Sequence, residues 1–481
     1  MMRLSELFSV LDAQLIGCDT AFLSVGTDSR HIEQAQLFVA IKGENFDGNE
    51  YATQALAQGA AAVLISDATL TRHIKSGLLV KDTRLALGLL AQYWRQKFDI
   101  PLIAITGSNG KTTVKEMTAA ILSVATANAE AVLATKGNFN NDIGMPLTLL
   151  KLNASHQFAV IEMGMNHTGE LEYLTRLALP NIALVNNAGT AHIGELGSQY
   201  AIAQAKGEIF SGLGADGVAI INADDAYADY WKSLNSGRNT VTFGLSQSAN
   251  QGADITATTT ERNGLTQVNL STPQGNITFD LNVLGAHNVR NALAASAVAF
   301  ALNISLGDIA KGLTKFAGVS GRLTRCAGIN GAVVIDDTYN ANPDSMRVAI
   351  DVLTAQAGDT MMVMGDMGEL GTDAAKLHAE IGSYAKKSGV KAFYTLGDMS
   401  VEANKAFGEA VNEMPINKQH AQHFASVDSL AQALESAMDS KTVVLVKGSR
   451  FMKMERVVNQ IIKQEQEASS MVKHMTSQGA H

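Results

Sequence analysis

The stretch that decides the fold is Ile103-Ala104-Ile105-Thr106-Gly107-Ser108-Asn109-Gly110-Lys111-Thr112-Thr113. An apolar run typical of a buried strand passes here through a glycine turn into a helical pattern at Val114 to Leu122. Glycines let successive backbone N–H groups converge on phosphate oxygens, and the N-terminus of the following helix adds its dipole. The stretch therefore predicts a phosphate-binding loop. Its nucleotide-binding residues would be Gly107, Ser108, Asn109, Gly110, Lys111, Thr112 and Thr113.

Two side chains in this loop suit phosphate and metal chemistry. Lys111 supplies a mobile cation, and Thr112 offers a hydroxyl to Mg²⁺. The usual spacing places a first glycine six residues before the lysine, where this chain has Ile105. A glycine-rich turn without chemical consequence is the alternative, but Gly-Lys-Thr-Thr directly after a strand favours nucleotide binding. Glu162, at the end of another apolar run, would complete the metal site, although a solvated or capping carboxylate fits it equally well.

Outward from the loop, apolar runs of strand length alternate with helical patterns. This alternation predicts an α/β fold with parallel sheets. In the middle segment we expect strands at residues 102–106, 158–163, 182–186, 218–222 and 241–243. Residues 254–284 alternate with a period of two and contain turns at Asn263-Gly264 and Pro273 to Gly275, so they predict an attached antiparallel ribbon. A helix at residues 287–302 follows.

The 481 residues are too many for one hydrophobic core, and the pattern divides them into three domains. We predict a first domain at residues 1–98, with strands at 37–41, 62–65 and 78–80 and a helix at 83–97. The central domain with the phosphate-binding loop would span 99–317. A Rossmann-like α/β domain would span 318–465, with strands at 333–336, 360–364, 392–396 and 442–446. Residues 466–481 form a polar tail.

The composition of the chain excludes several classes of binding partner and location. The net charge is −9 and no basic run stands out, so we expect no nucleic-acid partner. Cys18 and Cys326 are far apart, which excludes a disulfide framework and favours a reducing, cytoplasmic location. The longest weakly polar stretch, residues 292–304, is shorter than the roughly 20 residues of a membrane span. We expect a monomer without a membrane span.

Three motifs in this order resemble the Mur ligase family. They are the loop Thr106 to Thr113, the segment Gly137 to Pro146 and the segment Asp336 to Pro343. Two more segments, Met364 to Gly371 and Lys447 to Arg450, resemble the branch that adds D-alanyl-D-alanine to UDP-N-acetylmuramoyl-tripeptide. The likeness extends over all three predicted domains.

The resemblance implies an ATP-dependent acid–amino-acid ligase of peptidoglycan precursor synthesis. The tripeptide carboxylate would attack the γ-phosphate of ATP, giving an acyl phosphate and ADP, and the dipeptide amine would then displace phosphate. Two anions must meet, so the site needs fixed cations and Mg²⁺, two ions in this family. The small-molecule partners would be UDP-N-acetylmuramoyl-tripeptide and D-alanyl-D-alanine.

The resemblance also assigns catalytic and metal-binding roles. Lys111 would hold phosphates, with Thr112 and Glu162 on the first Mg²⁺. His192 matches the histidine associated with the second metal, and a surface-loop histidine is its plainer interpretation. Lys206 matches a lysine that some members carry as a carbamate, which turns a cation into an anionic oxygen ligand. A lysine on a solvated helix face is an equally good interpretation.

Further nucleotide contacts follow from the resemblance. Asn288 matches the family's nucleotide-contacting asparagine, and helix N-capping is its alternative role. Arg322 resembles an arginine that reaches the phosphates and acts in catalysis, while Asp337 resembles the carboxylate that takes the ribose hydroxyls.

Substrate-binding residues are expected in two places. Thr27 to Arg30 and Ala40 to Gly48 resemble the first-domain UDP pocket, and asparagine amides near residue 140 can both donate to and accept from a peptide. The plain alternative for each asparagine is a turn residue. The candidate substrate-binding residues are Ser29, Arg30, Lys42, Asp47, Asn138, Asn140 and Asn141.

Other functions remain open at this point. One is another Mur-type amino-acid-adding ligase or a folylpolyglutamate-type ligase, yet the Asp-Asn-Pro-Arg tetrapeptide of the third-residue adder is absent from the sequence. Another is a non-catalytic ATP-gated binding module. That function leaves His192, Lys206 and the asparagine cluster unexplained.

Overall fold

The computed structural model describes residues 1–191, 193–245, 252–262, 265–408 and 420–463. The chain forms two compact units. The first comprises Met1–Gly189, Leu196–Asn282 and Ala286–Ala317, and the second comprises Thr190–Glu195, Val283–Gly285 and the chain from Gly318 onward.

The central sheet of the first unit is a parallel sheet with the strand order β13-β12-β11-β8-β10-β9. Its strands are β8 (Leu102–Thr106), β9 (Val132–Ala134), β10 (Phe158–Glu162), β11 (Ile182–Val185), β12 (Val218–Asn222) and β13 (Asn239–Phe243). Strands β8 and β11 are buried along their whole length, as expected where helices cover both faces of a parallel sheet. All loops that follow these strands leave from one edge of the sheet.

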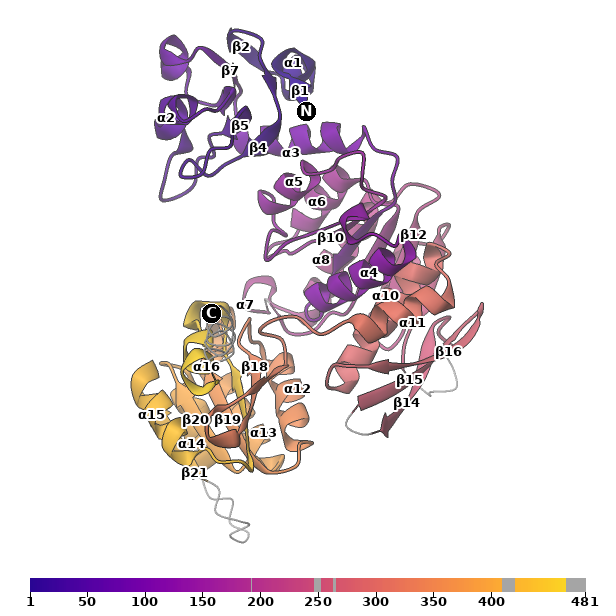
Figure 1. Ribbon diagram of the computed structural model, residues 1–481, viewed down its shortest axis with the longest axis vertical. Coiled ribbons are helices and arrows are strands. Elements are labelled where there is room, and N and C mark those ends of the chain that lie inside the picture. Colours follow the sequence, from indigo (N-terminus) through magenta and orange to yellow (C-terminus); the bar gives the residue numbers. More distant parts are fainter. Residues whose placement is uncertain (192, 246–251, 263–264, 409–419, 464–481) are drawn as a thin grey trace, which may run out of the picture. The chain divides into compact units, whose positions relative to one another are not determined.

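Helices cover this sheet on both sides. Figure 1 shows α4 (Lys111–Ala125), α10 (Ala286–Ala301) and α11 (Leu306–Lys315) on one side. Helices α5 (Gly144–Leu149) and α6 (Glu170–Ala178) lie on the other. Two further helices, α8 (Gln199–Gly207) and α9 (Ala228–Leu234), follow β11 and β12 in the chain.

The predicted ribbon is an antiparallel three-stranded sheet. Its strands are β14 (Thr256–Arg262), β15 (Leu265–Thr272) and β16 (Gly275–Leu281). The turn between β15 and β16 consists of Pro273 and Gln274, and Gly275 follows with a φ of +129°. The other predicted turn, Asn263-Gly264, lies outside the described residues.

A smaller sheet precedes the central one. Its order is β2-β7-β6-β5-β4, and all neighbours are parallel except β2 and β7. The strands are β2 (Gln14–Gly17), β4 (Ser24–Gly26), β5 (Gln36–Val39), β6 (Ala62–Ile65) and β7 (Ser76–Leu79), with helices α1 (Phe8–Leu11), α2 (Ala52–Ala57) and α3 (Thr83–Arg95). Asp82 caps α3 by accepting from the N–H groups of Arg84 and Leu85. Helix α3 packs against α5 and α6.

The second unit is built on another six-stranded sheet, with the order β17-β18-β22-β19-β20-β21. Only β17 runs antiparallel to its neighbour. The strands are β17 (Thr324–Ala327), β18 (Val333–Asp337), β19 (Asp359–Gly365), β20 (Ala392–Leu396), β21 (His420–Phe424) and β22 (Thr442–Lys447). The helices are α12 (Pro343–Thr354), α13 (Ala374–Lys387), α14 (Ser400–Gly408), α15 (Val427–Ala437) and α16 (Glu455–Ile461).

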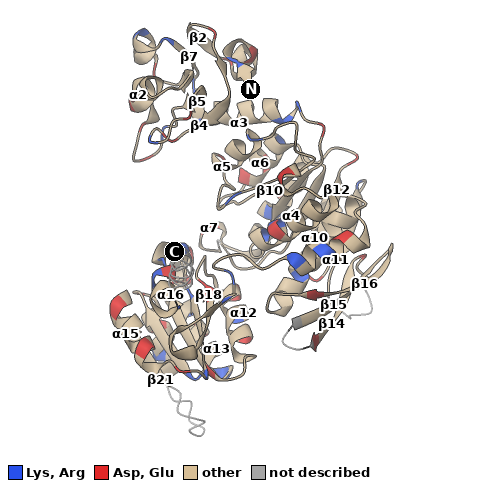
Figure 2. Ribbon diagram, viewed as in Figure 1, with Lys and Arg blue, Asp and Glu red and all other residues tan. Residues whose placement is uncertain are grey.

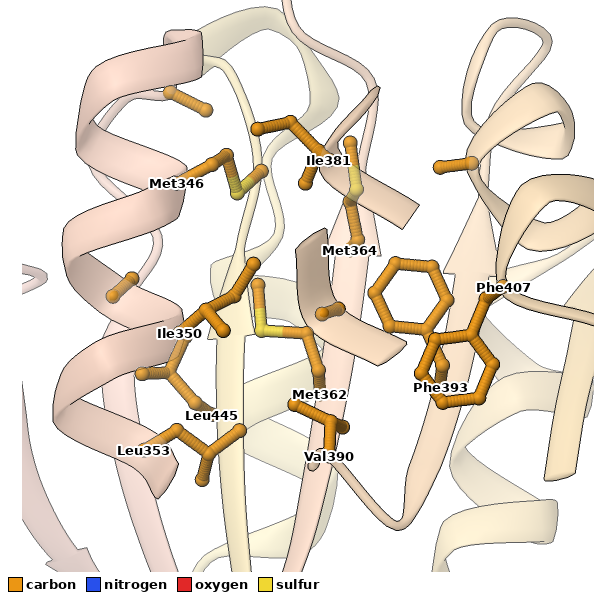
Figure 3. Close-up of a cluster of buried hydrophobic side chains, with 14 of the residues drawn as sticks. Met346, Ile350, Leu353, Met362, Met364, Ile381, Val390, Phe393, Phe407 and Leu445 are labelled. Atoms are coloured by element: carbon orange, nitrogen blue, oxygen red, sulfur yellow. The ribbon is translucent and has the colours of Figure 1, made fainter. Parts of the chain in front are cut away.

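One face of this sheet carries a methionine-rich core. Figure 3 shows Met346 and Ile350 of α12 directed toward the sheet, where β19 carries Met362 and Met364. Phe393 and Phe407 stack with ring centroids 4.9 Å apart and planes 8° apart. Burial of such side chains contributes about 1.5–3 kcal/mol each. This packing fixes the strand ends that carry the polar residues described below.

Charges of both signs are interspersed along the ribbons of Figure 2. Within the described parts of the chain, no helix combines the length and the apolar character that crossing a membrane requires. The predicted α/β architecture, with its parallel sheets and its ribbon, is confirmed. The helix expected at 114–122 in fact begins at Lys111, directly after the glycine turn. The division into three domains and a tail stays a prediction.

Candidate active site

The loop between β8 and α4 depends on Gly110. This residue has a φ of +82°, which side chains other than glycine rarely tolerate. A Cβ at this position would lie 2.4 Å from Asn291 Oδ1 and 2.5 Å from Asn186 Nδ2. Glycine is therefore required both by the backbone angle and by the neighbouring amides. Directly after it, Lys111 begins α4, so the loop amides stand at a helix N-terminus.

Asparagines from the neighbouring strand hold the loop in place. The Asn109 N–H donates to Asn187 Oδ1 at 2.9 Å, and the Asn109 carbonyl accepts from Asn186 Nδ2 and Asn187 Nδ2 at 2.9 and 3.0 Å. Asn186 Nδ2 also donates to Asn291 Oδ1 at 3.1 Å. Asn291 in turn donates to Asn288 Oδ1 at 3.1 Å. The loop is thus fixed before any ligand arrives, which is preorganisation.

The loop side chains lie close to the backbone. Lys111 Nζ donates to the carbonyl of Gly107 at 2.6 Å. The Ser108 N–H donates to the Asn187 carbonyl at 3.0 Å, and Ser108 Oγ accepts from the Gly189 N–H at 3.0 Å. Thr112 and Thr113 are buried in the first turn of α4. The ammonium of Lys111 is therefore held at the loop.

Glu162 lies at the carboxyl end of β10, and its Cα pairs with Ile105 of β8. The side chain is buried. Its Oε1 accepts from Asn140 Nδ2 at 2.8 Å, whereas Oε2 is buried without a hydrogen-bond partner among the described residues. An unsatisfied buried carboxylate oxygen is costly unless a cation or water reaches it. This orphaned oxygen fits a divalent cation beside the phosphate-binding loop.

Lys206 is fully buried near the end of α8. Burial, followed by the nearby charge of Lys111, lowers the pKa of Lys206 well below its usual value. No carboxylate among the described residues forms an ion pair with it. The surface interpretation of Lys206 is thus wrong for this structure, because the side chain is buried. A neutral amine at this position is a nucleophile toward carbon dioxide.

The asparagine segment after β9 makes several contacts that support the fold. Asn141 Oδ1 accepts from the N–H of Gly144, the first residue of α5, at 2.8 Å. Asp142 forms an ion pair with Arg84 of α3, with Arg84 Nη2 donating at 2.8 Å. Asn138 is exposed. The segment is therefore held at Asn141 and Asp142.

The candidate UDP residues follow β4 and β5, two parallel neighbours, so both segments leave one edge of the smaller sheet. Arg30 binds Asp28 through two side-chain hydrogen bonds of 2.8 Å, and this pair lowers the pKa of Asp28. Lys42 Nζ lies 3.2 Å from Asp47 Oδ2 across a β-bridge. Ser29 is half-buried beside them in sequence.

In the second unit, Asp337 ends β18 and is buried. Its Oδ2 accepts from Lys447 Nζ at 2.6 Å, and its Oδ1 accepts from the Leu323 N–H at 3.2 Å. Burial raises the pKa of Asp337, and the charges of Lys447 and Arg322 oppose that rise. The guanidinium of Arg322 lies 4.2 Å from the ring centroid of Tyr339. Asp337, Arg322 and Lys447 thus form one charged cluster.

The described residues supply few of the ligands that a metal ion needs. His192 lies outside the described residues. Within the part of the chain that is described, no three His, Cys, Asp or Glu side chains gather closely enough to hold a metal ion. A cation at Glu162 would therefore need hydroxyl, phosphate or water oxygens as its other ligands.

Sequence reasoning missed several supporting residues. Asn186 and Asn187 come directly after an apolar strand that neighbours β8, and this position was the available signal. Lys115, a buried lysine one turn after Lys111, donates to the Thr135 carbonyl at 2.6 Å. Lys447 lies in the segment Lys447 to Arg450 that carries part of the resemblance, but its ion pair with Asp337, 110 residues away, gave no local signal.

Comparison with protein families finds three matches along the chain. The Mur ligase middle domain matches residues 105–299, and the Mur ligase glutamate ligase domain matches residues 321–450. The catalytic domain of the Mur ligase family matches residues 22–95. Among curated proteins, the chain is 41% identical to the UDP-N-acetylmuramoyl-tripeptide–D-alanyl-D-alanine ligase of Haemophilus influenzae, covering 95% of this chain and 98% of that protein. It is 40% identical to the same enzyme of Escherichia coli, covering 95% and 97%.

Comparison with solved structures also finds similarity to Mur ligases. The chain is similar to a crystal structure of MurF from Acinetobacter baumannii, with a TM-score of 0.84 and 35% identity over 95% of this chain and 97% of that one. It is also similar to the MurF ligase of Thermotoga maritima in complex with ADP, with a TM-score of 0.78 and 26% identity over 91% and 96%. Sequence and fold agree over nearly the full length, and the chain therefore belongs to the Mur ligase family.

Proposed function

We propose that this chain joins D-alanyl-D-alanine to UDP-N-acetylmuramoyl-tripeptide with the consumption of ATP, in peptidoglycan precursor synthesis. It is an ATP-dependent ligase, like the relatives that match 97–98% of their own length. The observation that carries the proposal is the preorganised loop at 107–113 beside a buried Glu162 with an orphaned oxygen. The loop amides can bind a polyanion, and the carboxylate of Glu162 can bind a cation beside it.

The chemistry must bring two anions together. The terminal carboxylate of the tripeptide attacks the γ-phosphorus of ATP, the bond to the bridging oxygen breaks, and ADP leaves with that electron pair. The amine of D-alanyl-D-alanine then attacks the acyl carbon, phosphate leaves, and the amine loses a proton. Loop amides and Lys111 hold the phosphates and offset the charge that gathers in the transition state. Asn288 stands within hydrogen-bond reach of Asn291 behind the loop and is the further nucleotide contact of this unit.

Two Mg²⁺ ions fit this donor set. When bound, Mg²⁺ neutralises phosphate charge and polarises the γ-phosphate. Glu162 Oε2 and the Thr112 hydroxyl would hold the first ion, and His192 with a modified Lys206 would hold the second. The oxygen donors of Glu162, Thr112 and the modified Lys206 agree with the preference of Mg²⁺.

Lys206 carries the modification in this proposal. The lowered pKa leaves a neutral amine, which adds to carbon dioxide to form a carbamate with the loss of one proton. The carbamate is an anion in a buried position next to Lys111, whose charge stabilises it. The unmodified ammonium would instead be repelled there.

Substrate contacts complete the proposal. The UDP moiety would bind to Ser29, Arg30, Lys42 and Asp47. Two of these residues, Arg30 and Lys42, are cations at one edge of the smaller sheet, and cations suit a diphosphate. Asn138, Asn140 and Asn141 would line the peptide end. In the second unit, Arg322 would reach the phosphates, and Asp337 would accept from the ribose hydroxyls. We further propose a monomer that acts in the cytoplasm, consistent with two free cysteines.

Phosphate release by the purified protein tests the proposal. UDP-N-acetylmuramoyl-tripeptide with D-alanyl-D-alanine should give phosphate and ADP in equal amounts with the pentapeptide product. Turnover only with free amino acids would indicate another amino-acid-adding ligase, and turnover only with folate and glutamate would indicate a folylpolyglutamate-type ligase. ATP binding without any product would indicate a binding module. Each of these three results would overturn the proposed function.

A further inference from the structure

The two oxygens of Glu162 have different surroundings. Oε1 accepts a hydrogen bond from Asn140 Nδ2 at 2.8 Å, whereas Oε2 is buried and has no hydrogen-bond partner in the described ranges. A carboxylate held by one oxygen has little freedom to rotate about its last bond. The hydrogen bond from Asn140 therefore restricts the directions in which Oε2 can point.

The main chain of Glu162 is fixed from the same side. Its N–H donates to Thr135 Oγ1 at 2.9 Å. The carbonyl of Thr135 accepts from the buried Lys115 Nζ at 2.6 Å. The end of β10 is thus tied to the end of β9 and, through Lys115, to the helix that starts at the phosphate-binding loop.

Asn140 itself is held tightly. Its N–H donates to the Asn138 carbonyl at 2.7 Å, and its carbonyl accepts from the Gly164 N–H at 2.8 Å. A Cβ on Gly164 would lie 3.0 Å from Asn140 Oδ1, so glycine leaves the space that the amide fills. With both main-chain groups bonded, the Asn140 side chain approaches Glu162 from a rigid loop.

We propose that Asn140 is a positioning residue, which holds Oε1 of Glu162 so that Oε2 is presented to the metal cation. This inference rests on the proposed function, in which Glu162 binds Mg²⁺. Removal of the amide would leave both carboxylate oxygens without a protein donor and let the side chain rotate or take up a proton. Groups that orient a metal ligand typically change metal affinity by about 10- to 100-fold.

A direct role in peptide binding makes a different prediction. If Asn140 bound the peptide only, its loss would raise the KM for UDP-N-acetylmuramoyl-tripeptide and leave metal affinity unchanged. A positioning residue acts through Glu162, so its effect on metal affinity must vanish when Glu162 is absent. A double-mutant cycle separates these cases.

The test measures Mn²⁺ binding by electron paramagnetic resonance with saturating ADP and without either substrate of the ligase reaction. The variants are Asn140→Ala, Glu162→Ala and the double variant. Asn128→Ala is the matched control, because Asn128 precedes β9, Asn140 follows it, and Asn128 Oδ1 accepts one hydrogen bond, from the Glu130 N–H. Asn140→Ser replaces Asn140→Ala if the alanine variant does not fold.

We expect Asn140→Ala to weaken Mn²⁺ binding by about tenfold or more, Asn128→Ala to leave it unchanged, and the double variant to match Glu162→Ala. Normal Mn²⁺ affinity in Asn140→Ala with impaired affinity in Glu162→Ala would overturn the positioning role alone. Normal affinity in both would overturn the metal role of Glu162 in the proposed function. Additive losses would also overturn the inference, since Asn140 would then act independently of Glu162.

Discussion

Two buried lysines, one in each unit, have opposite surroundings. Lys206 of α8 and Lys447 of β22 are 1% and 3% exposed. Lys447 Nζ lies 2.6 Å from Asp337 Oδ2 and 2.8 Å from the Asn340 carbonyl. Lys206 has no ion-pair partner in the described part of the chain and has Lys111 nearby instead.

The difference shows what burial alone does to an ammonium group. Without a counter-charge, burial favours the neutral amine, and the pKa of Lys206 falls. With a carboxylate in contact, the ion pair can persist in the interior at a high desolvation cost. The surroundings of Lys206 therefore favour a neutral amine, and those of Lys447 favour a fixed charge.

Lys111→Ala removes the cation next to Lys206. We expect amide formation to fall by about 10³-fold or more, because the phosphates lose their main charged contact. Binding of UDP-N-acetylmuramoyl-tripeptide, measured by calorimetry, should be unchanged, and the exposed Lys151→Ala should keep wild-type activity. Substantial ligase activity in Lys111→Ala would show that the loop assignment is wrong.

Asp337→Asn tests the paired lysine. It leaves the Lys447 ammonium buried without its carboxylate, which should destabilise the second unit by about 3–5 kcal/mol. Both tryptophans, Trp94 and Trp231, lie in the first unit, so hydrogen exchange of β18 and β22 is the suitable measurement.

The control for this variant is Asp359→Asn, which breaks the exposed pair with Lys391 and should cost less than about 1 kcal/mol. Equal exchange in Asp337→Asn and Asp359→Asn would contradict the claim that burial makes the Asp337 pair different.

Lys206→Ala tests the unpaired lysine in catalysis. We expect a loss of about 10²-fold in rate, since one charged ligand of the reacting centre disappears. Formate or acetate should restore part of the rate by supplying the missing carboxylate in the vacated space. A near-normal rate, or a lost rate that the acids do not change, would end the carbamate proposal.

Lys206→Met tests the same residue through stability. The folded pKa is lowered, so below the unfolded value of about 10.5 the unfolded chain binds a proton that the folded chain does not. Stability is therefore lost as the pH falls from that value toward the folded pKa. Lys206→Met should raise stability by about 1–2 kcal/mol near neutral pH, in buffer free of bicarbonate, nucleotide and metal.

This gain should shrink as the pH approaches the unfolded value. The exposed Lys151→Met should change stability by less than about 0.5 kcal/mol at any pH. Destabilisation by Lys206→Met would mean that the lysine is charged and paired in the folded protein.

The sequence predicted those features that local patterns encode. Strand 102–106, the glycine turn and the helix after it follow from one short stretch, and Glu162 follows from its place at a strand end. The supporting contacts were beyond reach, because Asn140 and Glu162 are 22 residues apart and Asn186 and Asn291 are 105 apart. Such pairs depend on strand order and register, which the periodicity of a single segment does not contain.

The burial of individual lysines also could not be predicted from the sequence. Lys206 and Lys115 occur in helical segments where a lysine is normally solvated, and only the packing of α8 and α4 reveals that both are buried. The distinction between a reactive and a paired lysine needs the positions of Lys111 and Asp337, which tertiary structure supplies.

We expect the triphosphate of ATP to bind at the loop formed by residues 107–113. A crystal structure with a non-hydrolysable ATP analogue and Mn²⁺ tests this directly. We predict phosphate oxygens on the amides of Gly107 to Thr113 and an anomalous Mn²⁺ peak beside Glu162 Oε2. A triphosphate bound elsewhere, with this loop empty, would contradict the account.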